Sequence, residues 1–287
     1  MADLPSLDTQ RLQRFIQLGL EEDLGPGDYT SQATIPAGKR GRAKLLVKGH
    51  GVLCGTPVAR AIFNYLDPSC AFDIEIEEGA DVLPGDVAFY VDGPIRTLLS
   101  GERLALNTMQ RLSGIAHLSR TFAKAVEGTG AKVLDTRKTT PGLRFLEKYA
   151  VKVGGAENYR VGLYDWIMIK DNHVDGAGGM RQAIEGVHRF LEEQSLALDI
   201  TVEVRNLREL RTVLEVGGVR RIMLDNFEIG KLREAVEIVG GRFETEASGG
   251  VTIDSVREIA ETGVDYISSG ALTHSARQVD ISFKVVA

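Results

Sequence analysis

The chain has 287 residues, a formal net charge of −6 and a pI near 5.5, which suits one large domain or two modest ones with a real hydrophobic core. The acidic balance argues against nucleic acid as the main partner, because a phosphate backbone is bound by a basic surface. A membrane protein and a secreted protein are also disfavoured, since no apolar run reaches the roughly 20 residues that span a bilayer and the N-terminus lacks the apolar core of a signal peptide.

The first part of the chain predicts a small α+β layer with an antiparallel sheet. Leu12, Phe15, Ile16 and Leu20 recur at helical spacing and indicate an amphipathic helix over 7–23. Short apolar or alternating runs then favour strands at 42–48, 51–54, 72–77 and 87–91, with a helix at 56–66. A long helix is expected over 99–126, with Ser113-Gly114 as a candidate break. None of these motifs carries obvious chemistry.

From Lys132 onward strands and helices alternate. Strands are expected at 132–136, 166–169, 200–204, 221–224, 243–247 and 265–268, and helices at 141–152, 179–193, 206–216, 228–239 and 252–261. This alternation predicts a parallel sheet with helical crossovers, either closed into a barrel or open and doubly wound. No GxGxxG follows the first strand, which weighs against a Rossmann domain.

Polar residues follow every strand of this second region. They are Arg137-Lys138, Lys170-Asp171-Asn172, Glu203, Asp225-Asn226, Ser248-Gly249-Gly250 and Ser269-Gly270. In a closed barrel these strand ends share one rim, and barrel enzymes place their sites there. We therefore interpret the region as an α/β barrel with a polar rim.

The stretch 135–173 gives the strongest chemical signal. Arg137 and Lys138 follow one strand, Lys170 follows the next, and Arg160 lies on the loop between them. A strand, a helix and a strand form a parallel βαβ unit, in which both strands end on the same side. We expect the four cations to converge and to bind a substrate with several negative groups. The alternative is that they are ordinary solvated surface charges.

Glu203 and Asp225 are carboxylates at the ends of two consecutive strands. They could act as general acid and base, or hold a hard divalent cation directly or through its waters. Mg²⁺ suits such a place, because it uses one or two carboxylates together with substrate phosphates. The alternative is a pair of rim salt bridges to Lys170 or Arg137.

The Gly-rich turns at 248–250 and 269–270 come late in the barrel, where free backbone N–H groups can cradle a phosphate. His274 lies just past the second turn and is a candidate phosphate contact. The five histidines show no metal-ligand spacing, which disfavours zinc. Cys54 and Cys70 show no metal or redox spacing, so we expect two free thiols and a reducing cytoplasm.

Ordered motifs over nearly the whole chain resemble one family. They are GDYTS at 27–31, ERLALNTMQRLSGIA at 102–116, DTRKTTPGLR at 135–144, GGAENYRVGLYD at 154–165, IKDNH at 169–173, VEV at 202–204, LDN at 224–226, EASGG at 246–250 and ISSGALTHSA at 267–276. The chain thus resembles quinolinate phosphoribosyltransferase, also called nicotinate-nucleotide pyrophosphorylase (carboxylating), of NAD biosynthesis.

The resemblance implies a fold and an assembly. An N-terminal α/β sandwich domain would cover 1–113, an open-seamed α/β barrel would cover 114–276, and the C-terminal strand within 277–287 would return to the sandwich. The family works as a dimer or a hexamer, with each site completed by the neighbour's sandwich domain. The implied reaction joins quinolinate to phosphoribosyl pyrophosphate, needs Mg²⁺, and gives nicotinate mononucleotide, pyrophosphate and CO₂.

The resemblance also implies residue roles. The two carboxylates of quinolinate would meet Arg137, Arg160, Lys170 and a neighbouring subunit's Arg103, through charge-assisted hydrogen bonds. Thr139 would also contact substrate. Catalysis would rest on Lys138, Glu203 and Asp225, which would hold pyrophosphate, ribose hydroxyls and Mg²⁺. The 5′-phosphate would lie on Ser248, Gly249, Gly250, Ser269 and Gly270, with His274.

Two positions depart from the family pattern, and two rival functions stay open. Tyr159 stands where the family usually has His, and His117 where it tends to have Thr. One rival is a related phosphoribosyltransferase for another small acid such as nicotinate, which would need a single carboxylate clamp. The other is a non-catalytic barrel that binds a phosphorylated ligand, against which the presence of both Glu203 and Asp225 speaks.

Overall fold

The structure is a computed structural model that describes residues 6–286. The chain divides into two compact units. The first unit collects residues 1–120, 139–155 and 272–287, and the second collects residues 121–138 and 156–271. Residues 114–120, 139–155 and 272–276, which the sequence analysis put with the barrel, thus fall in the first unit. Positions 1–5 and 287 of the expected domains lie outside the described residues.

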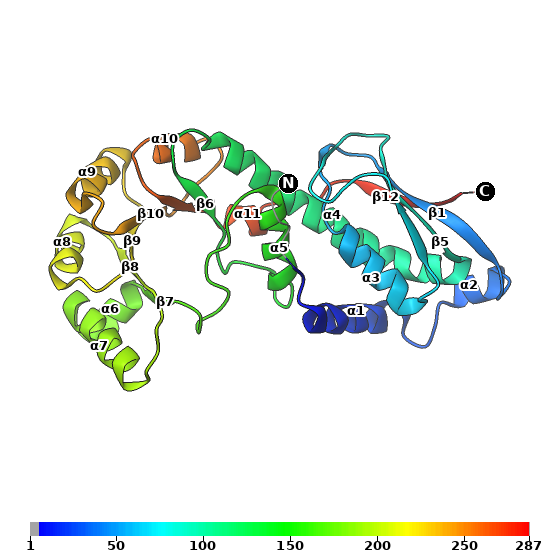
Figure 1. Ribbon diagram of the computed structural model, residues 1–287, viewed down its shortest axis with the longest axis horizontal. Coiled ribbons are helices and arrows are strands. Elements are labelled where there is room, and N and C mark those ends of the chain that lie inside the picture. The colour runs from blue at the N-terminus through cyan, green and yellow to red at the C-terminus, as the bar shows by residue number, and fades with distance from the viewer. Residues whose placement is uncertain (1–5, 287) are drawn as a thin grey trace. The chain divides into compact units, whose positions relative to one another are not determined.

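The first unit is built on a four-stranded antiparallel sheet in the order β12-β1-β5-β3 (Figure 1). Its strands are β1 (Arg40–Val47), β3 (Ala71–Ile74), β5 (Val87–Pro94) and β12 (Ile281–Val286), and a small ladder joins β2 (Gly51–Val52) to β4 (Asp81–Val82). Strand β12 pairs with β1 from Arg42↔Val286 to Val47↔Ile281. Phe63 of α3 stacks on Phe283 of β12 at 5.5 Å between ring centroids, so the C-terminal strand contributes to the core of this unit.

Six helices of the described residues belong wholly or mainly to the first unit. They are α1 (Thr9–Leu24), α2 (Tyr29–Thr34), α3 (Thr56–Leu66), α4 (Ile95–Ala125), α5 (Arg144–Gly154) and α11 (Ala271–His274). The break expected at Ser113-Gly114 is wrong, because α4 runs through both residues. The Ser113 hydroxyl donates to the Cys54 carbonyl and accepts from the Cys54 N–H, and a Cβ on Gly114 would lie 2.1 Å from the Arg277 carbonyl oxygen. Both residues serve close packing rather than termination of the helix.

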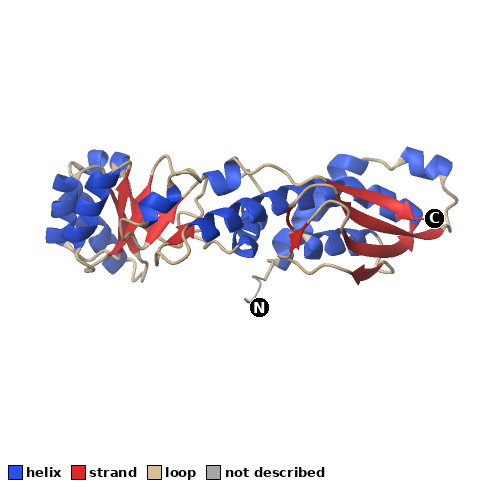
Figure 2. Ribbon diagram, turned by 90° about the horizontal axis from the view of Figure 1, so that it is seen from above, coloured by secondary structure: helices blue, strands red, loops and turns tan. Residues whose placement is uncertain are grey.

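The second unit is a six-stranded sheet in the order β6-β11-β10-β9-β8-β7, and all its pairings are parallel. The strands are β6 (Lys132–Leu134), β7 (Ile167–Ile169), β8 (Ile200–Val204), β9 (Arg221–Asp225), β10 (Glu244–Ser248) and β11 (Tyr266–Ser268). The helices α6 (Asp171–Ala177), α7 (Met180–Glu193), α8 (Leu207–Val216), α9 (Ile229–Val239) and α10 (Val256–Ala260) lie on the outer side of the strands (Figures 1 and 2). The predicted α/β class, with a parallel-stranded second part, is confirmed.

One detail of the prediction is wrong: the strands β6 and β7 do not form a βαβ unit across α5. They stand at opposite ends of the sheet order, and α5 belongs to the first unit. Its partners explain why. Glu147 of α5 accepts from Arg111 of α4 at 2.8 Å, and the Tyr149 hydroxyl donates to Glu78 at 3.0 Å. The helix is therefore anchored by polar contacts within the first unit.

Three short helices, α2, α6 and α11, were not predicted from the sequence. Helix α6 begins directly after Lys170, and the ring of His173 accepts the Lys170 N–H at Nδ1, 3.0 Å away. This contact gives His173 of the IKDNH motif a capping role. The four-residue helix α11 (Ala271–His274) follows the turn at Ser269-Gly270.

Candidate active site

The polar residues of the second unit lie where its strands end. Lys170 directly follows β7, Glu203 is the penultimate residue of β8, Asp225 ends β9 and Ser248 ends β10. Arg137 comes three residues after the end of β6. Because the strands are parallel, these ends share one edge of the sheet. The rim that the sequence predicted is therefore a single surface of this unit.

Lys170 and Glu203 form an ion pair on this rim. The Lys170 Nζ donates to Glu203 Oε2 at 2.5 Å; the Glu203 side chain is only 8% exposed and the Lys170 side chain 42%. The salt bridge weighed as an alternative role for the carboxylate is thus present. It keeps a partly buried carboxylate paired, because an unpaired charge there would cost several kcal/mol, of the order known for broken buried pairs.

Asp225 is held at both carboxylate oxygens. The Ser248 hydroxyl donates to Oδ1 at 2.6 Å, and the Asn226 side-chain amide donates to Oδ2 at 2.7 Å. Asn226 adopts the left-handed conformation, with φ 55°, and its N–H donates to the Ser248 carbonyl at 2.8 Å. The Ser248 hydroxyl therefore orients the carboxylate, which the sequence analysis had not foreseen.

The turn at Gly249-Gly250 makes room for this arrangement. Both glycines are left-handed, with φ 92° and 60°. A Cβ on Gly249 would lie 2.3 Å from the side-chain oxygen of Asn226, whereas a Cβ on Gly250 would meet nothing within 4 Å. Gly249 thus allows the close approach of Asn226, and Gly250 leaves the backbone accessible for a ligand.

Arg137 and Arg160 are close enough to repel each other. Burial lowers the pKa of Arg160, and Arg137 lowers it further, while Asp165 and Glu246 act in the opposite direction. Arg160 is 9% exposed. Two guanidinium groups in such a place favour the binding of an anionic group, because the anion relieves their repulsion.

The loop that carries Arg160 is fixed on both sides. On the N-terminal side of Arg160, the Tyr159 N–H donates to the buried carboxylate of Asp135 at 2.8 Å. On its C-terminal side, the N–H groups of Val161 and Gly162 donate to the Asp165 carboxylate at 2.6 and 2.8 Å. The backbone position of Arg160 is therefore defined without a ligand.

The remaining rim residues have mixed roles. Lys138 is exposed, and its N–H donates to Thr136 Oγ1 at 3.1 Å. Ser269 is buried: its N–H donates to the Leu134 carbonyl and its hydroxyl to the Val251 carbonyl. Ser269 thus ties the end of β11 to its neighbours, while Gly270 is half-buried beside it.

Three predicted site residues, Arg103, Thr139 and His274, lie in the first unit. The Arg103 side chain is 60% exposed, with Glu102 3.9 Å away. Thr139 Oγ1 accepts from Arg144 at 3.0 Å. His274 is exposed, and its Nδ1 lies 2.7 Å from the Ser275 hydroxyl.

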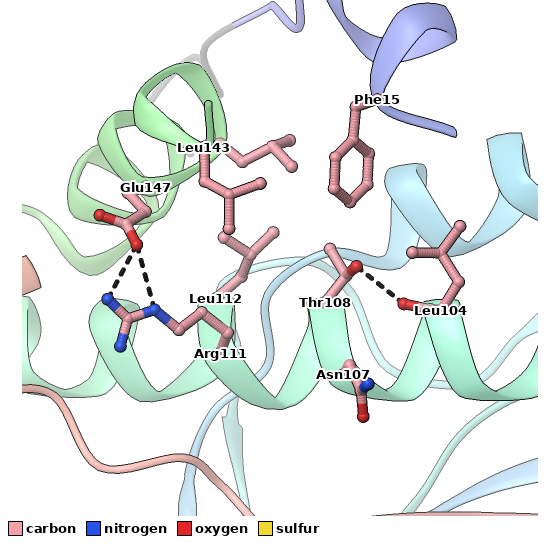
Figure 3. A pocket seen from close by; sticks show the side chains of 9 residues that line it. Phe15, Leu104, Asn107, Thr108, Arg111, Leu112, Leu143 and Glu147 are labelled. Carbon is pink, nitrogen blue, oxygen red and sulfur yellow. Dashed lines mark hydrogen bonds and ion pairs between the residues drawn. The ribbon is translucent and has the colours of Figure 1, made fainter. Parts of the chain in front are cut away.

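A pocket of about 160 Å³ also lies in the first unit, among α1, α4 and α5 (Figure 3). Its lining is mainly apolar and includes Phe15, Leu104, Leu112, Leu143 and Leu146. The Arg111 guanidinium at its edge is already bound to Glu147 (Figure 3). A polyanionic substrate would find no available cation in this pocket, so we assign the site to the rim.

A polar cluster inside the second unit was not predicted from the sequence. Arg221 at the start of β9 donates to Glu244 and Glu246 of β10, and Glu246 is fully buried. The alternation of Glu244 and Glu246 within a strand was the available signal, because residues two apart point to one face. Burial, more than anything else, raises the pKa of Glu246, while Ser268, Arg221 and Lys170 oppose that rise.

The donor set of the rim fits Mg²⁺ bound with a phosphorylated substrate. Glu203 and Asp225 offer hard carboxylate oxygens on neighbouring strands. Within residues 6–286 no group of three or more His, Cys, Asp and Glu side chains could hold a metal ion. Two carboxylates without a third protein ligand suit an ion that takes its remaining ligands from phosphates and water.

The same residues contain no helix that is both long and apolar enough to cross a lipid bilayer. Cys54 and Cys70 are both buried and free.

Comparisons with known proteins agree over nearly the whole chain. The quinolinate phosphoribosyl transferase N-terminal domain matches residues 28–113, and the C-terminal domain matches residues 115–284. Quinolinate phosphoribosyltransferase (decarboxylating) 1b of Nicotiana tabacum is 44% identical and covers 98% of this chain and 84% of its own. The chloroplastic nicotinate-nucleotide pyrophosphorylase (carboxylating) of Oryza sativa subsp. japonica is 45% identical over 98% of this chain and 79% of its own. The crystal structure of NadC from Streptococcus pyogenes is 34% identical, with a TM-score of 0.92 over 99% of this chain and 100% of that one.

Proposed function

This chain belongs to the quinolinate phosphoribosyltransferase family, and from that premise we propose how its own residues carry out the reaction. The chain transfers a phosphoribosyl group from phosphoribosyl pyrophosphate to quinolinate and removes one carboxylate, giving nicotinate mononucleotide, pyrophosphate and CO₂. The step belongs to the biosynthesis of NAD. The structural observation that supports it best is the cationic rim, where Arg160 lies close to Arg137 and Lys170 follows β7 at the edge formed by the strand ends, which matches an acid with two adjacent carboxylates.

Binding of the acid would use this cluster. Arg160 and Arg137 would share one carboxylate, so that the repulsion between them is relieved on binding. Lys170, now paired with Glu203, would take the second. Arginine suits such contacts because its planar fork matches a carboxylate in two parallel hydrogen bonds.

The transfer step needs little covalent help from the protein. The pyridine nitrogen attacks C1 of the ribose, the C1–O bond breaks, and its electron pair leaves with pyrophosphate. Lys138, Glu203 and Asp225 would act on the pyrophosphate and the ribose, and electrostatic stabilisation of the departing charge should dominate. The Gly250 and Gly270 turns would hold the 5′-phosphate.

Decarboxylation follows from the positive charge on the ring nitrogen. The bond between C2 and its carboxylate breaks, CO₂ leaves, and the electron pair stays at C2 beside the quaternised nitrogen. C2 then takes up a proton. The protein's part is to hold the carboxylate in place until the bond breaks.

Glu203 and Asp225 would hold Mg²⁺, and the bound ion would neutralise charge on the pyrophosphate. We expect Asp225→Asn to raise the Mg²⁺ concentration that gives half-maximal activity, because an amide is a weaker ligand than a carboxylate. The measurement is activity against Mg²⁺ concentration, with the exposed Asp254→Asn as a matched control. Unchanged metal dependence in both Asp225→Asn and Glu203→Gln would remove these roles.

We also propose a dimer or a hexamer in which the first unit of one subunit completes the site of another through Arg103. The Arg103 side chain supports this, since it is 60% exposed and the carboxylate of Glu102 lies 3.9 Å away. A reducing cytoplasm is the proposed compartment, because Cys54 and Cys70 are free thiols.

One assay separates this function from its rivals. Release of pyrophosphate and CO₂ is measured with phosphoribosyl pyrophosphate and quinolinate, nicotinate or no acceptor. We expect both products with quinolinate alone. Pyrophosphate without CO₂ in the nicotinate arm would instead indicate a transferase for a mono-acid, and no turnover in any arm would indicate a binding protein.

A further inference from the structure

Arg221 lies in an aromatic box beneath the rim. Its guanidinium carbon is 3.8 Å from the ring centroid of Tyr266, 5.0 Å from that of Tyr159 and 5.4 Å from that of Trp166. The side chain is 6% exposed. A desolvated cation over aromatic faces is attracted by the negative faces of the rings, in addition to its ion pairs.

The box is rigid because Thr201 joins two of its rings. The Tyr159 hydroxyl lies 2.5 Å from Thr201 Oγ1, and the Trp166 indole N–H donates to the same oxygen at 2.8 Å. Tyr159 is also fixed by its backbone N–H on Asp135. The residue that departs from the family's usual His therefore connects the box directly to Arg160, its neighbour in sequence.

Glu246 links this box to the cations of the rim. Its Oε2 accepts from Arg221 at 3.2 Å, and its Oε1 has no hydrogen-bond partner in the described part of the chain. Its side chain is 0% exposed. In the strand register Glu246 and Glu203 both lie beside Met223, so the two carboxylates stand at the same level of the sheet, and Glu203 binds Lys170. On the other side, the Arg221 guanidinium that holds Glu246 packs on the ring of Tyr159, the residue before Arg160.

We propose that Glu246 is a positioning residue of the site: a buried carboxylate, held from below by Arg221, that aligns Arg160 and Lys170 for the two carboxylates of the acid. This inference rests on the proposed function. Glu246 acts through the two cations and does not itself contact the substrate.

The charge balance of the rim supports the proposal. Arg137 lies close enough to Arg160 to lower its pKa, and Lys170 on the same rim is paired with Glu203. The charge of Glu246, added to that of Asp165, would reduce the repulsion between the two arginines before substrate arrives. An incompletely satisfied carboxylate is costly in a buried place, which argues for a use beyond packing.

Glu246→Gln tests the proposal, because it keeps the side-chain shape and removes the charge. We expect kcat with quinolinate to fall by about tenfold or more, since the cations are no longer aligned. The KM for quinolinate should stay within about twofold or decrease, because the cluster becomes more positive and attracts the dianion more strongly. The KM for phosphoribosyl pyrophosphate should stay within about twofold.

Glu244→Gln is the matched control. Glu244 lies on the same strand and accepts from Arg221 at 2.9 Å, but it is two residues farther from the rim. We expect its kcat and both KM values to stay within about twofold of wild type. Arg221→Gln should reproduce the loss in kcat, and the double variant Glu246→Gln/Arg221→Gln should be no worse than either single change, because the two residues act as one unit.

Thermal unfolding of each variant separates positioning from folding. A change in kcat of less than twofold in Glu246→Gln overturns the proposal, and so does a common rise in both KM values with a lower Tm, which would show a purely structural role. Any other combination of changes in kcat and KM also overturns the proposal. If the wild-type protein does not turn over quinolinate at all, the proposed function fails first, and the two failures are thereby distinguished.

Discussion

Arg160 is nearly buried and lies close to a second arginine, Arg137. This environment determines how much activity its removal should cost. Arg160→Ala should lower kcat/KM for quinolinate by about 30-fold or more, because loss of one partner of a desolvated charge pair costs roughly 2–5 kcal/mol. The KM for phosphoribosyl pyrophosphate should change much less, since its phosphates are assigned to other residues. The measurement is steady-state kinetics with each substrate varied in turn.

Arg181→Ala is a suitable control for Arg160→Ala, because its side chain on α7 is 49% exposed and pairs with Glu185 one helical turn away. If Arg160→Ala weakened phosphoribosyl pyrophosphate and left quinolinate unchanged, the assignment of the cation cluster to the acid would be wrong.

Glu78 makes the stability of the protein depend on pH. Its carboxylate accepts from the N–H groups of Gly55 and Thr56 and from the Tyr149 hydroxyl, yet burial outweighs these bonds and raises its pKa. A carboxyl whose pKa is raised by folding binds its proton more tightly in the native state. The contribution of Glu78 to the free energy of unfolding is therefore fully present below the pKa that this group has in the unfolded chain. It is lost as pH rises through the pKa that the group has in the folded protein.

The free energy of unfolding of wild type, relative to Glu78→Gln, should accordingly fall as pH rises from about 4 toward neutrality. Urea unfolding at several pH values measures this, with the exposed Glu77→Gln as a control for loss of one charge. A wild-type advantage that grew with pH would mean that the hydrogen bonds outweigh burial.

Site residues could be predicted from the sequence where a charged side chain lies at the end of a strand. Lys170, Glu203 and Asp225 were found in this way, because strand ends can be located from apolar runs. The actual partners of Ser248 and Ser269 could not be predicted, since short hydroxyl contacts depend on how turns fold back on each other. Glu246 was missed because a buried strand is expected to be apolar.

At the scale of single elements, α4 shows how a glycine can serve packing. Gly114→Ala should destabilise the protein by about 1–3 kcal/mol, because the new Cβ would meet the Arg277 backbone carbonyl, which has little freedom to move. Gly230→Ala in α9 is the matched control: its Cβ would meet nothing within 4 Å. There the change should be neutral or stabilising by up to about 1 kcal/mol.

Chemical unfolding of the two variants side by side tests this comparison. Equal stability of Gly114→Ala and wild type would show that the segment at Arg277 can shift without cost.

The order of helices and strands was largely predictable, but the unit to which α5 belongs was not. Apolar periodicity locates a helix near 141–152, and α5 is observed there. Periodicity does not say which sheet the helix packs on. That choice depends on partners far away in sequence, such as Arg111 for Glu147 and Glu78 for Tyr149.

At the scale of the whole molecule, the proposed sharing of sites between subunits can be tested by mixing inactive variants. Equal amounts of Arg103→Ala and Lys138→Ala chains, allowed to exchange subunits, should recover about a quarter of wild-type activity in a dimer, because half of the dimers are mixed and each mixed dimer has one intact site.

Mixing Lys138→Ala with Lys170→Ala gives the matched control, because both residues lie in the second unit and no mixed dimer would contain an intact one. Subunit exchange is checked with tagged chains. Equal recovery in both mixtures, or none in either once exchange is established, would rule out the shared site.

The position of β12 has a consequence for synthesis of the chain on the ribosome. Strand β12 covers one edge of β1, but residues 48–280, which include the whole second unit, lie between them in sequence. At 5–20 residues per second the nascent β1 edge waits roughly 10 to 50 s for its partner. During that interval an unpaired strand edge can recruit other chains. The second unit can complete its sheet before the first, so co-translational chaperones would be needed most for the unit that is synthesised earliest.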